Sequence, residues 1–416
     1  MSEKTGVKRT RLKYLAHLEM GQSPPSAEYS LSPDEGLPFL QGTADFASRY
    51  PVPRVFCSSP TKVAAVGDIL FSVRAPVGEL NIANREFGIG RGLCAVRPRS
   101  LDAQFAWWAL YEARDQLHKV ATGSTYDAVA TEDVGNLGAV NPLRPQQMAI
   151  AKYLDRETAR LDGLVAAKER LLGLLAEKRR ALITRAVTRG LNPSAPLRDS
   201  GIPWLGQIPA HWKVKRLKLV AEVRGGLTLG KNYGLAQLAE YPYLRVANVQ
   251  DGRLDLSEVT TVLVPKSEAT SCLLQAGDVL MNEGGDADKL GRGCVWQGEI
   301  SPCLHQNHVF AVRPNRVSSE WLDLWTSTES AKSYFESRAK RSTNLASISG
   351  TNIKELPIPL PPVDERRAIR VHIISETAKL DALSATAERT IVLLNERRAA
   401  LIAAAVTGQL NIPEAG

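Results

Sequence analysis

Two glycine-rich stretches are the first residues that could do chemistry, because glycine-rich loops can cradle phosphate groups. Residues 225–232 approach a nucleotide-binding P-loop, but the stretch is one residue short, and Asn232 replaces the hydroxyl that would hold magnesium. Residues 88–92 have the wrong spacing for a dinucleotide-binding fingerprint and lead into an expected strand instead of a helix. We therefore expect neither stretch to bind a nucleotide.

Other catalytic motifs are missing from the sequence. His305 and His308 are a possible metal pair, but on a strand residues i and i+3 point to opposite faces. There is no HExxH and no Gly-x-Ser-x-Gly nucleophile elbow. Residues 141–143 are not the Asn-Pro-Pro-aromatic stretch with which base methyltransferases hold a flipped base, and we find no S-adenosylmethionine pocket. We expect no enzyme activity, no cofactor and no metal.

Polar and basic residues in expected loops favour binding over catalysis. Arginine and lysine can contact phosphates or guanine, asparagine can read adenine, and glycine allows the backbone to come close. Any one such residue is equally compatible with a solvated loop, but equivalent loops in both halves of the chain carry them. The candidate DNA-binding residues are Arg74, Arg91, Lys119, Thr122, Ser124, Thr125, Asn282, Lys289, Arg292, Arg341, Ser342, Thr343 and Asn344.

The composition fits a globular protein with a polyanionic partner. The chain has 416 residues, enough for two or three domains, and its hydrophobic content of 44% and charged content of 23% are ordinary. The formal net charge is +8 and the isoelectric point is about 9.2, which favours nucleic acid as a partner. Many basic proteins bind no nucleic acid, so charge alone does not decide the matter.

The cysteines and the N-terminus indicate a cytoplasmic protein. Five cysteines are an odd number, and none has CxxC spacing, so we expect reduced and packed thiols, not a zinc site or disulfides. The residues after Met1 lack the apolar core of a secretory signal. No apolar run reaches the ~18 residues of a membrane span, so we expect no membrane contact.

The loops lie between larger elements, and one of these is a long helical stretch that occurs twice. At one constant shift along the chain, Ile150 corresponds to Ile369 and Leu182 to Leu401. Apolar residues recur at intervals of three and four, as in the seam of a coiled coil, with Glu157 and Glu376 as polar seam positions. The expected seam residues are Ile150, Leu154, Leu161, Leu164, Leu175, Leu182, Ile369, Leu380, Leu383, Leu394 and Leu401.

A globular part precedes each long helix, and the two parts share landmarks in the same order. Residues 67–70 match residues 277–280 as Gly-Asp-(Ile/Val)-Leu, and residues 93–98 match 309–314 as a further expected strand. We also expect opening strands at 11–15 and 216–223, and Trp107 and Trp108 in the core. The expected division is a first domain at 1–142, a helix at 143–190, a linker at 191–203, a second domain at 204–360, a helix at 361–410 and a tail at 411–416.

This order of parts resembles the specificity subunits of type I restriction–modification systems. The likeness is carried by the repeated Gly-Asp-(Ile/Val)-Leu, by residues 204–212 and 360–369, and by Glu-(Lys/Arg)-Arg-x-Ala-Leu-Ile at 177–183 and 396–402. It covers essentially the whole chain. The resemblance implies an α+β fold in which two similar mixed α/β target recognition domains alternate with two long helices. These helices would pack as an antiparallel coiled coil, giving a pseudo-twofold internal repeat.

The same resemblance implies a non-catalytic subunit that binds DNA in a sequence-specific way. Each domain would read one half of a bipartite, asymmetric target in double-stranded DNA, and the helices would fix the gap between the halves. The implied partners are two modification (methyltransferase) subunits and the restriction (translocase/endonuclease) subunits. The sequence departs from an even repeat at Gly163 and Gly173, where the second helix has Ala382 and Val392. The alternative is a coiled-coil scaffold whose globular domains bind protein partners.

Overall fold

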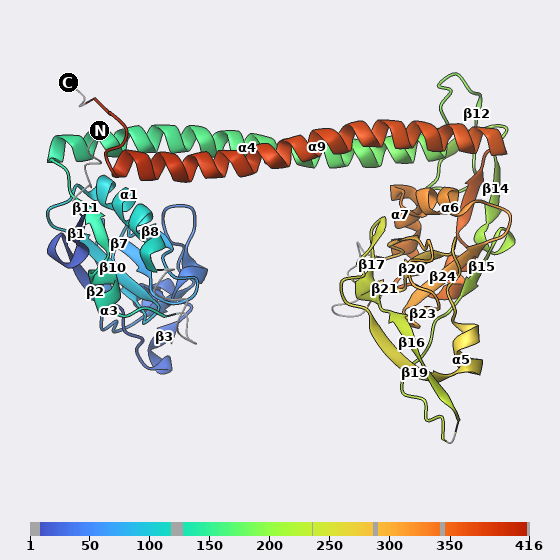
Figure 1. The fold of residues 1–416 in the computed structure, drawn as a ribbon, viewed down its shortest axis with the longest axis horizontal. Helices are drawn as coiled ribbons and strands as arrows, with labels where there is room; N and C mark the ends of the chain where they lie inside the picture. Colours follow the sequence, from blue (N-terminus) through green and yellow to red (C-terminus); the bar gives the residue numbers. More distant parts are fainter. Residues whose placement is uncertain (1–8, 118–127, 235, 286–289, 342–345, 414–416) are drawn as a thin grey trace, which may run out of the picture. The chain divides into compact units, whose positions relative to one another are not determined.

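The computed structural model describes residues 9–117, 128–234, 236–285, 290–341 and 346–413, and the chain divides into two compact units (Figure 1). Unit 1 contains Met1–Glu169 and Glu388–Gly416, and unit 2 contains Arg170–Ala387. Each unit therefore holds one globular part and a portion of each long helix. Because the division runs through the helices, the domain boundaries expected from the sequence stay a prediction.

Both long helices are present as continuous elements. Helix α4 (Arg144–Arg189) has 46 residues and helix α9 (Val363–Val406) has 44. Glutamate, lysine, arginine, alanine and leucine, which lose little entropy in a helix, dominate both sequences. Gly190 and Gly408 follow the two helices with φ angles of 72°, a left-handed conformation that glycine adopts without strain and that ends a helix.

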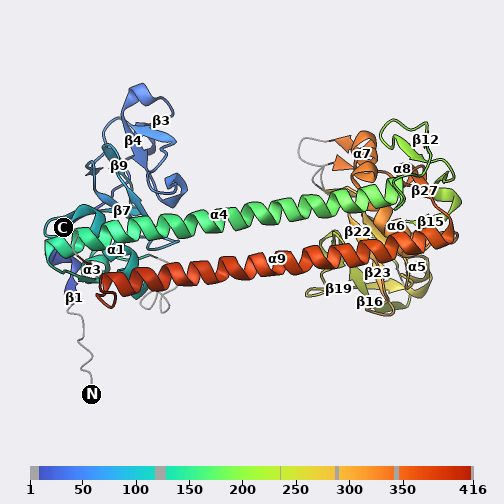
Figure 2. The same ribbon diagram turned by 90° about the horizontal axis from the view of Figure 1, so that it is seen from above.

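Within each unit the two helices pack antiparallel (Figures 1 and 2). Residues later in α4 meet residues earlier in α9, both through ion pairs and through the shared cores. In unit 1 Asp162 forms an ion pair with Arg398 at 3.0 Å, and Ile150 and Val406 belong to one core. In unit 2 Arg179 forms an ion pair with Asp381, and Val187 and Ile369 belong to one core. The expected antiparallel packing is confirmed within each unit.

The seam differs from the expected one in the middle of both helices. Six expected seam residues are buried, namely Ile150, Leu154, Leu161, Leu175, Ile369 and Leu380, and three are half-buried, namely Leu182, Leu394 and Leu401. Leu164 and Leu383 are 44% and 55% exposed, so their assignment to the seam is wrong. The buried face steps by four from Leu161 to the half-buried Val165, not by three to Leu164.

Two threonines occupy seam positions that the sequence pattern left empty or assigned to glutamate. Thr158 and Thr377 are 4% and 7% exposed, and the Thr158 hydroxyl donates to the carbonyl of Leu154 at 2.6 Å. This bond satisfies the hydroxyl inside the helix, so burial leaves no polar group unpaired. Glu157 and Glu376 lie beside the seam, where they form ion pairs with basic side chains, so the expectation of polar seam glutamates is also wrong.

The core of unit 1 is a four-stranded antiparallel sheet with helices on one face and a second sheet on the other. Ile69 and Phe71 point into the core shared with the helices, while Leu70 between them points into the core shared with the second sheet. The strand order is β2 (Ala16–Met20), β10 (Leu93–Pro98), β7 (Ile69–Ser72) and β8 (Leu80–Ile82). Helices α1 (Ala103–Ala113) and α3 (Thr131–Gly135) complete the helical layer with α4 and α9.

The second sheet of unit 1 has five short strands, in the order β3 (Tyr29–Ser30), β5 (Val55–Cys57), β4 (Leu37–Leu40), β9 (Phe87–Ile89) and β6 (Val63–Ala64). The pairing of β4 with β9 is parallel, and the other pairings in this sheet are antiparallel. A separate ladder joins β1 (Arg9–Arg11) to β11 (Gly138–Val140).

Unit 2 repeats the topology of the four-stranded sheet and has a smaller second sheet. Its four-stranded sheet has the order β15 (Ala221–Arg224), β24 (Val309–Pro314), β20 (Val279–Asn282) and β22 (Gly293–Val295). Its second sheet has the order β19 (Thr260–Pro265), β16 (Leu238–Leu244) and β23 (Leu304–His305), again with one parallel pair, β16 with β23. The ladder of β14 (Lys213–Arg216) with β27 (Pro357–Leu360) matches β1 with β11. The internal repeat expected from the sequence is confirmed.

The remaining described elements of unit 2 are shorter. They are α5 (Lys266–Ser271), α6 (Ser319–Thr326), α7 (Glu329–Arg338), α8 (Gly350–Lys354), β12 (Leu197–Asp199), β13 (Gln207–Pro209), β17 (Val249–Gln250), β18 (Arg253–Leu254), β21 (Gly284–Gly285), β25 (Lys340–Arg341) and β26 (Ala346–Ser347). The segment expected to be a plain linker therefore contains a strand, because β12 pairs with β13. Within the part of the chain that the structure describes, no helix is both long and apolar enough to span a membrane.

The opening strands differ from the expected ones in the same way in both units. Each is interrupted by a 3-10 turn, at Leu12–Tyr14 and at Leu217–Leu219, so the chain leaves one ladder and enters the four-stranded sheet. The N–H of Leu12 donates to the carbonyl of Leu137, and the N–H of Leu217 donates to that of Leu356, in both cases directly after the ladder strand. Both leucines are fully buried, which holds the turn in the core.

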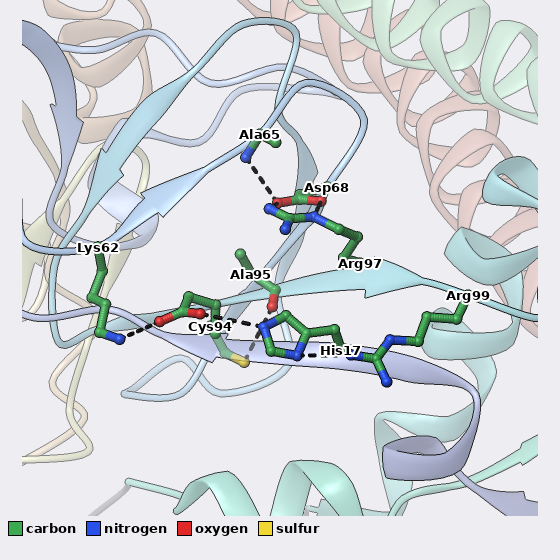
Figure 3. A network of polar contacts seen from close by, with 9 residues as sticks. His17, Lys62, Ala65, Asp68, Cys94, Ala95, Arg97 and Arg99 are labelled. Atoms are coloured by element: carbon green, nitrogen blue, oxygen red, sulfur yellow. Dashed lines mark hydrogen bonds and ion pairs between the residues drawn. The ribbon is translucent and has the colours of Figure 1, made fainter.

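The repeated Gly-Asp motif forms a buried turn that an arginine closes. In unit 1 the carboxylate of Asp68 accepts the N–H of Ala65 at 2.8 Å and two N–H groups of Arg97 at 2.8 and 2.7 Å (Figure 3). In unit 2 Asp278 accepts two N–H groups of Arg313 at 2.7 and 2.8 Å. These hydrogen bonds raise the pKa of both arginines, because they favour the charged guanidinium.

The cysteines and both tryptophans of the first unit pack in the core, as expected. All five cysteines are free and buried, and burial raises the pKa of Cys94, Cys294 and Cys303 to about 12, so these thiols are not reactive near neutral pH. Trp108 is 4% exposed and donates its indole N–H to Asp155 at 3.0 Å, while Trp107 packs against the same core. A buried indole with a bonded N–H is a structural residue, not a stacking platform.

Candidate nucleic-acid interface

Each unit has a hollow next to the C-terminal end of one strand of its four-stranded sheet, β7 in unit 1 and β20 in unit 2. The first hollow, in unit 1, has a volume of about 550 Å³ and is lined by Ser23, Pro24, Ser26, Tyr29, Gln41, Gly42, Thr43, Ala44, Arg74, Ala75, Arg91 and Gly92. The second hollow, in unit 2, has a volume of about 540 Å³ and is lined by Val246, Glu283, Gly284, Gly285, His308, Lys340, Arg341, Ala346 and Ser347. Both lie where loops meet, which is where binding residues gather on a rigid scaffold.

The backbone hydrogen bonds show that the two hollows are equivalent places in the repeat. In unit 1 the residue after β7 joins two other segments: the N–H of Val73 donates to Gly92, and the carbonyl of Val73 accepts the N–H of Val129, both at 2.9 Å. In unit 2 the residue after β20 does the same. The N–H of Glu283 donates to His308 at 2.9 Å, and the carbonyl of Glu283 accepts the N–H of Ile348 at 2.8 Å.

The first hollow contains two arginines that have no counterion within the described part of the chain. Arg74 and Arg91 are exposed, and neither guanidinium forms an ion pair or a hydrogen bond with another side chain among the described residues. Gly92 keeps the floor open, since a Cβ there would lie 2.5 Å from the carbonyl oxygen of Gln41. Burial raises the pKa of Tyr29, so its hydroxyl stays protonated and can donate. The arrangement suits phosphate oxygens or the acceptor edge of guanine.

The second hollow combines a carboxylate with cations. Oε2 of Glu283 lies 2.7 Å from Nδ1 of His308, and the two side chains are 27% and 56% exposed. Lys340 and Arg341, on the exposed strand β25, line the same hollow. Val246 stands where the first hollow has Gly42, because β16 and β4 have the same parallel pairing in their sheets. The same scaffold therefore holds different side chains in the two units.

Three of the predicted DNA-binding residues line these hollows, namely Arg74 and Arg91 in the first and Arg341 in the second. Eight others lie outside the described residues, and they are Lys119, Thr122, Ser124, Thr125, Lys289, Ser342, Thr343 and Asn344. The described residues next to two of these segments border the hollows, since Ala128 bridges to Arg74, and Arg341 pairs with Ala346.

Two predicted residues have structural roles instead. Asn282 is only 3% exposed, and its amide donates to the carbonyl of Val249 at 2.9 Å, so the expectation that it contacts a base is wrong. The reason is that residue 282 ends strand β20 and does not begin a loop. Arg292 is half-buried, and its guanidinium donates to the side chain of Gln250.

Other polar lining residues were not among the predicted DNA-binding residues, and they include Tyr29, Gln41, Glu283 and His308. The available signal was position. Glu283 and His308 lie next to two repeated landmark strands, one following Val279–Asn282 and the other preceding Val309–Pro314. The better candidates for binding residues were those that lie next to a repeated strand and differ between the two copies.

The nucleotide-like and metal-like motifs have structural explanations. Gly226 is required because a Cβ there would lie 2.2 Å from the carbonyl oxygen of His305, and Gly21 meets Gly90 in the same way in unit 1. Lys231 forms an ion pair with Glu268 at 2.9 Å. His305 is buried with Nδ1 2.6 Å from the carbonyl of Val309, and burial lowers its pKa. Among the described residues, no group of three or more His, Cys, Asp or Glu side chains is placed to hold a metal.

Comparison with known families identifies part of the chain. Residues 209–393 match the family described as "Type I restriction modification DNA specificity domain". This segment contains the second hollow and most of unit 2.

Curated relatives carry matching names. A putative type I restriction enzyme MjaX specificity subunit from Methanocaldococcus jannaschii is 37% identical over 153 residues, which cover 36% of this chain and 35% of that protein. The type I restriction enzyme EcoKI specificity subunit from Escherichia coli K12 is 23% identical over 317 residues, which cover 74% of this chain and 65% of that protein. Each of these two matches spans less than two thirds of the relative's length.

Solved structures share the fold. One match is a chain from a structure described as "Structural basis underlying complex assembly and conformational transition of the type I R-M system". Its TM-score is 0.66 and its identity is 19%, and the match covers 99% of this chain and 100% of that one. The HsdS subunit from Thermoanaerobacter tengcongensis matches with a TM-score of 0.52, 18% identity and coverage of 99% of both chains. At these identities the likeness establishes the α+β fold with its two long helices.

Proposed function

We propose that this chain, a relative of the specificity subunits of type I restriction–modification systems, is the DNA-reading subunit of such a complex. It binds double-stranded DNA and reads a bipartite, asymmetric target, one half-site with each unit. It is not an enzyme, and the chemistry of methylation and cleavage belongs to its partners.

One observation carries this proposal: the two units hold different side chains at equivalent hollows on one scaffold. Arg74 and Arg91 line the first hollow, and Glu283, His308 and Arg341 line the second. Sequence is read by side chains that contact base edges, whereas the scaffold only positions them. A duplicated scaffold with divergent contacts is what an asymmetric target requires, and the net charge of +8 favours the DNA backbone.

The long helices are the proposed docking surface for the partner subunits. Both carry large apolar side chains on their exposed faces, and such patches mark sites of protein association. The exposed residues are Met148, Leu164, Leu171, Leu174, Val363, Val371, Ile374, Leu383, Val392 and Leu393. The proposed partners are two modification subunits and the restriction subunits. With five free cysteines, the chain suits a reducing compartment, and we place it in the cytoplasm.

A selection of random-sequence duplexes with the full chain and its modification subunits tests the proposal. We expect two short, unlike conserved blocks separated by a constant gap. Arg74→Ala should relax or weaken one block only, and Arg341→Ala the other block only, because each side chain belongs to one unit. Recovery of no preferred sequence, or equal weakening of both blocks by each variant, would contradict the proposal.

The rival function, a coiled-coil scaffold whose globular parts bind proteins, is not favoured by the DNA specificity domain match. It remains separable by experiment. A DNA-reading subunit that neutralises several phosphates loses affinity steeply as salt rises, with a linear slope of log K against log salt. A protein-binding scaffold shows neither the slope nor a sequence preference.

A further inference from the structure

The two hollows differ most at the residue that follows β7 in unit 1 and β20 in unit 2. Val73 and Glu283 occupy the same place, as their matching backbone hydrogen bonds establish. Val73 is 2% exposed and contributes nothing to the surface, so the first hollow is lined by arginines without a carboxylate. Glu283 instead places a partly exposed carboxylate in the second hollow.

A histidine positions this carboxylate. His308 corresponds to Gly92 of the first hollow, where a side chain would collide with the carbonyl of Gln41. The 2.7 Å contact from Nδ1 of His308 to Oε2 of Glu283 fixes one carboxylate oxygen. Among the described residues, no side chain bonds to Oε1. A fixed carboxylate with an oxygen available is a hydrogen-bond acceptor that loses little entropy on binding.

A carboxylate is costly on a surface that approaches phosphates, because like charges repel. It is favourable only against a hydrogen-bond donor, and the donors that DNA presents in the major groove are the exocyclic amino groups of cytosine and adenine. Lys340 and Arg341, in the same hollow, offer the positive charges that phosphates need. The second hollow thus combines one acceptor for a base with two cations for the backbone.

We infer that Glu283 is a specificity-determining residue of unit 2, which accepts a hydrogen bond from the exocyclic amino group of a cytosine or an adenine, and that His308 is its positioning residue. This inference rests on the proposed function, since it names the base chemistry of one half-site. In the first hollow the only charged residues among the described lining residues are arginines, which donate to the acceptor edges of bases or to phosphates. One half-site is therefore read mainly by donors, and the other by a carboxylate acceptor.

The test compares Glu283→Ala, Glu283→Gln and His308→Ala in the full chain with its modification subunits, using selection of random-sequence duplexes. Glu283→Ala should relax the preference at one amino-bearing base pair of one block by about tenfold, within the range of one good base contact. The other block should stay unchanged. Glu258→Ala removes the same charge from an exposed site of unit 2 outside the hollow and should leave both blocks unchanged.

A base-analogue cycle gives a second readout. The identified base is replaced by an analogue that lacks the amino group, which should weaken binding by the wild-type chain and have little effect on Glu283→Ala. A nonzero coupling of this kind reports direct contact. His308→Ala should lower the same preference less than Glu283→Ala does, and the melting curve of each variant checks its fold.

The outcomes separate the two hypotheses. If the wild-type chain selects no sequence, the proposed function fails. If it selects two blocks and Glu283→Ala changes neither, or strengthens binding to all sequences equally, the carboxylate only links two loops and the inference is overturned. If the relaxed position carries no amino group in the major groove, the inference is overturned as well.

Discussion

At the scale of single residues, both units close the same tight turn with an aspartate and an arginine. Asp68 and Asp278 each terminate a tight turn whose glycine has a φ angle near 90°, and each is closed by an arginine from the neighbouring strand. The Asp278 side chain has no exposed surface and Arg313 is 20% exposed, whereas the Asp68 side chain retains 3% and Arg97 is 47% exposed. Equal geometry therefore comes with unequal burial.

This difference predicts unequal costs of removing the arginine. Arg313→Ala leaves a fully buried carboxylate without a counterion and should lower the free energy of unfolding by ~3 kcal/mol. Arg97→Ala should cost less, about 1 kcal/mol, because water can reach the exposed side of the pair. Urea unfolding of both variants measures the difference. Adding Asp278→Asn to Arg313→Ala should recover part of the loss, and an equal cost for both arginines would contradict the argument.

The identity of the binding residues was harder to predict from the sequence than the fold, for a physical reason. Asn282 and Glu283 are neighbours in an expected loop, and sequence patterns favour the asparagine as a base reader. In the structure Asn282 is still within the strand, so its amide bonds to backbone carbonyls, and the next residue carries the partly exposed side chain. A shift of one residue reverses the face of a strand, and composition cannot locate a strand end to one residue.

At the scale of elements, the long helices were predictable and their seam was only partly so. Continuous spacing of threes and fours and helix-favouring residues identify the helix without knowledge of its partner. The seam, in contrast, depends on where the spacing steps by four, and buried Thr158 looks polar in sequence while Leu164 looks apolar and lies exposed. A hydroxyl that donates to a carbonyl of its own helix can be buried without losing a hydrogen bond, so a hydrophobicity pattern wrongly places that residue on the surface.

Helix α4 also contains two glycines whose replacement should stabilise the protein. A Cβ at Gly163 or Gly173 meets no atom within 4 Å, so Gly→Ala adds helix propensity without a clash. Each change should raise the free energy of unfolding by up to ~1 kcal/mol. Gly293→Ala is the matched control, because a Cβ there would lie 1.7 Å from the carbonyl oxygen of Leu280, and it should destabilise. A loss of stability in Gly163→Ala or Gly173→Ala in urea unfolding would show that these glycines serve another purpose.

At the scale of the whole molecule, duplication explains which features the sequence reveals. The strand orders of the two four-stranded sheets agree, and short landmarks such as Gly-Asp-(Ile/Val)-Leu are enough to find the repeat. The hollows leave no such trace, because each is assembled from segments far apart in the chain, which in unit 1 lie within residues 23–29, 41–44, 74–75 and 91–92. Their equivalence becomes visible only through backbone pairing.

The continuity of both helices through the two units predicts that their length sets the gap between half-sites. Seven residues inserted between Glu169 and Arg170 and between Thr390 and Ile391 preserve the seam, because a heptad is two turns of a coiled coil. Each helix grows by ~10 Å, which corresponds to about three base pairs along B-DNA. Sequence selection or mapping of methylated positions should show a longer gap with both half-site sequences unchanged. A four-residue insertion at the same points is the control, since it breaks the seam and should lower stability; an unchanged gap in the heptad variant would remove the spacing role from the helices.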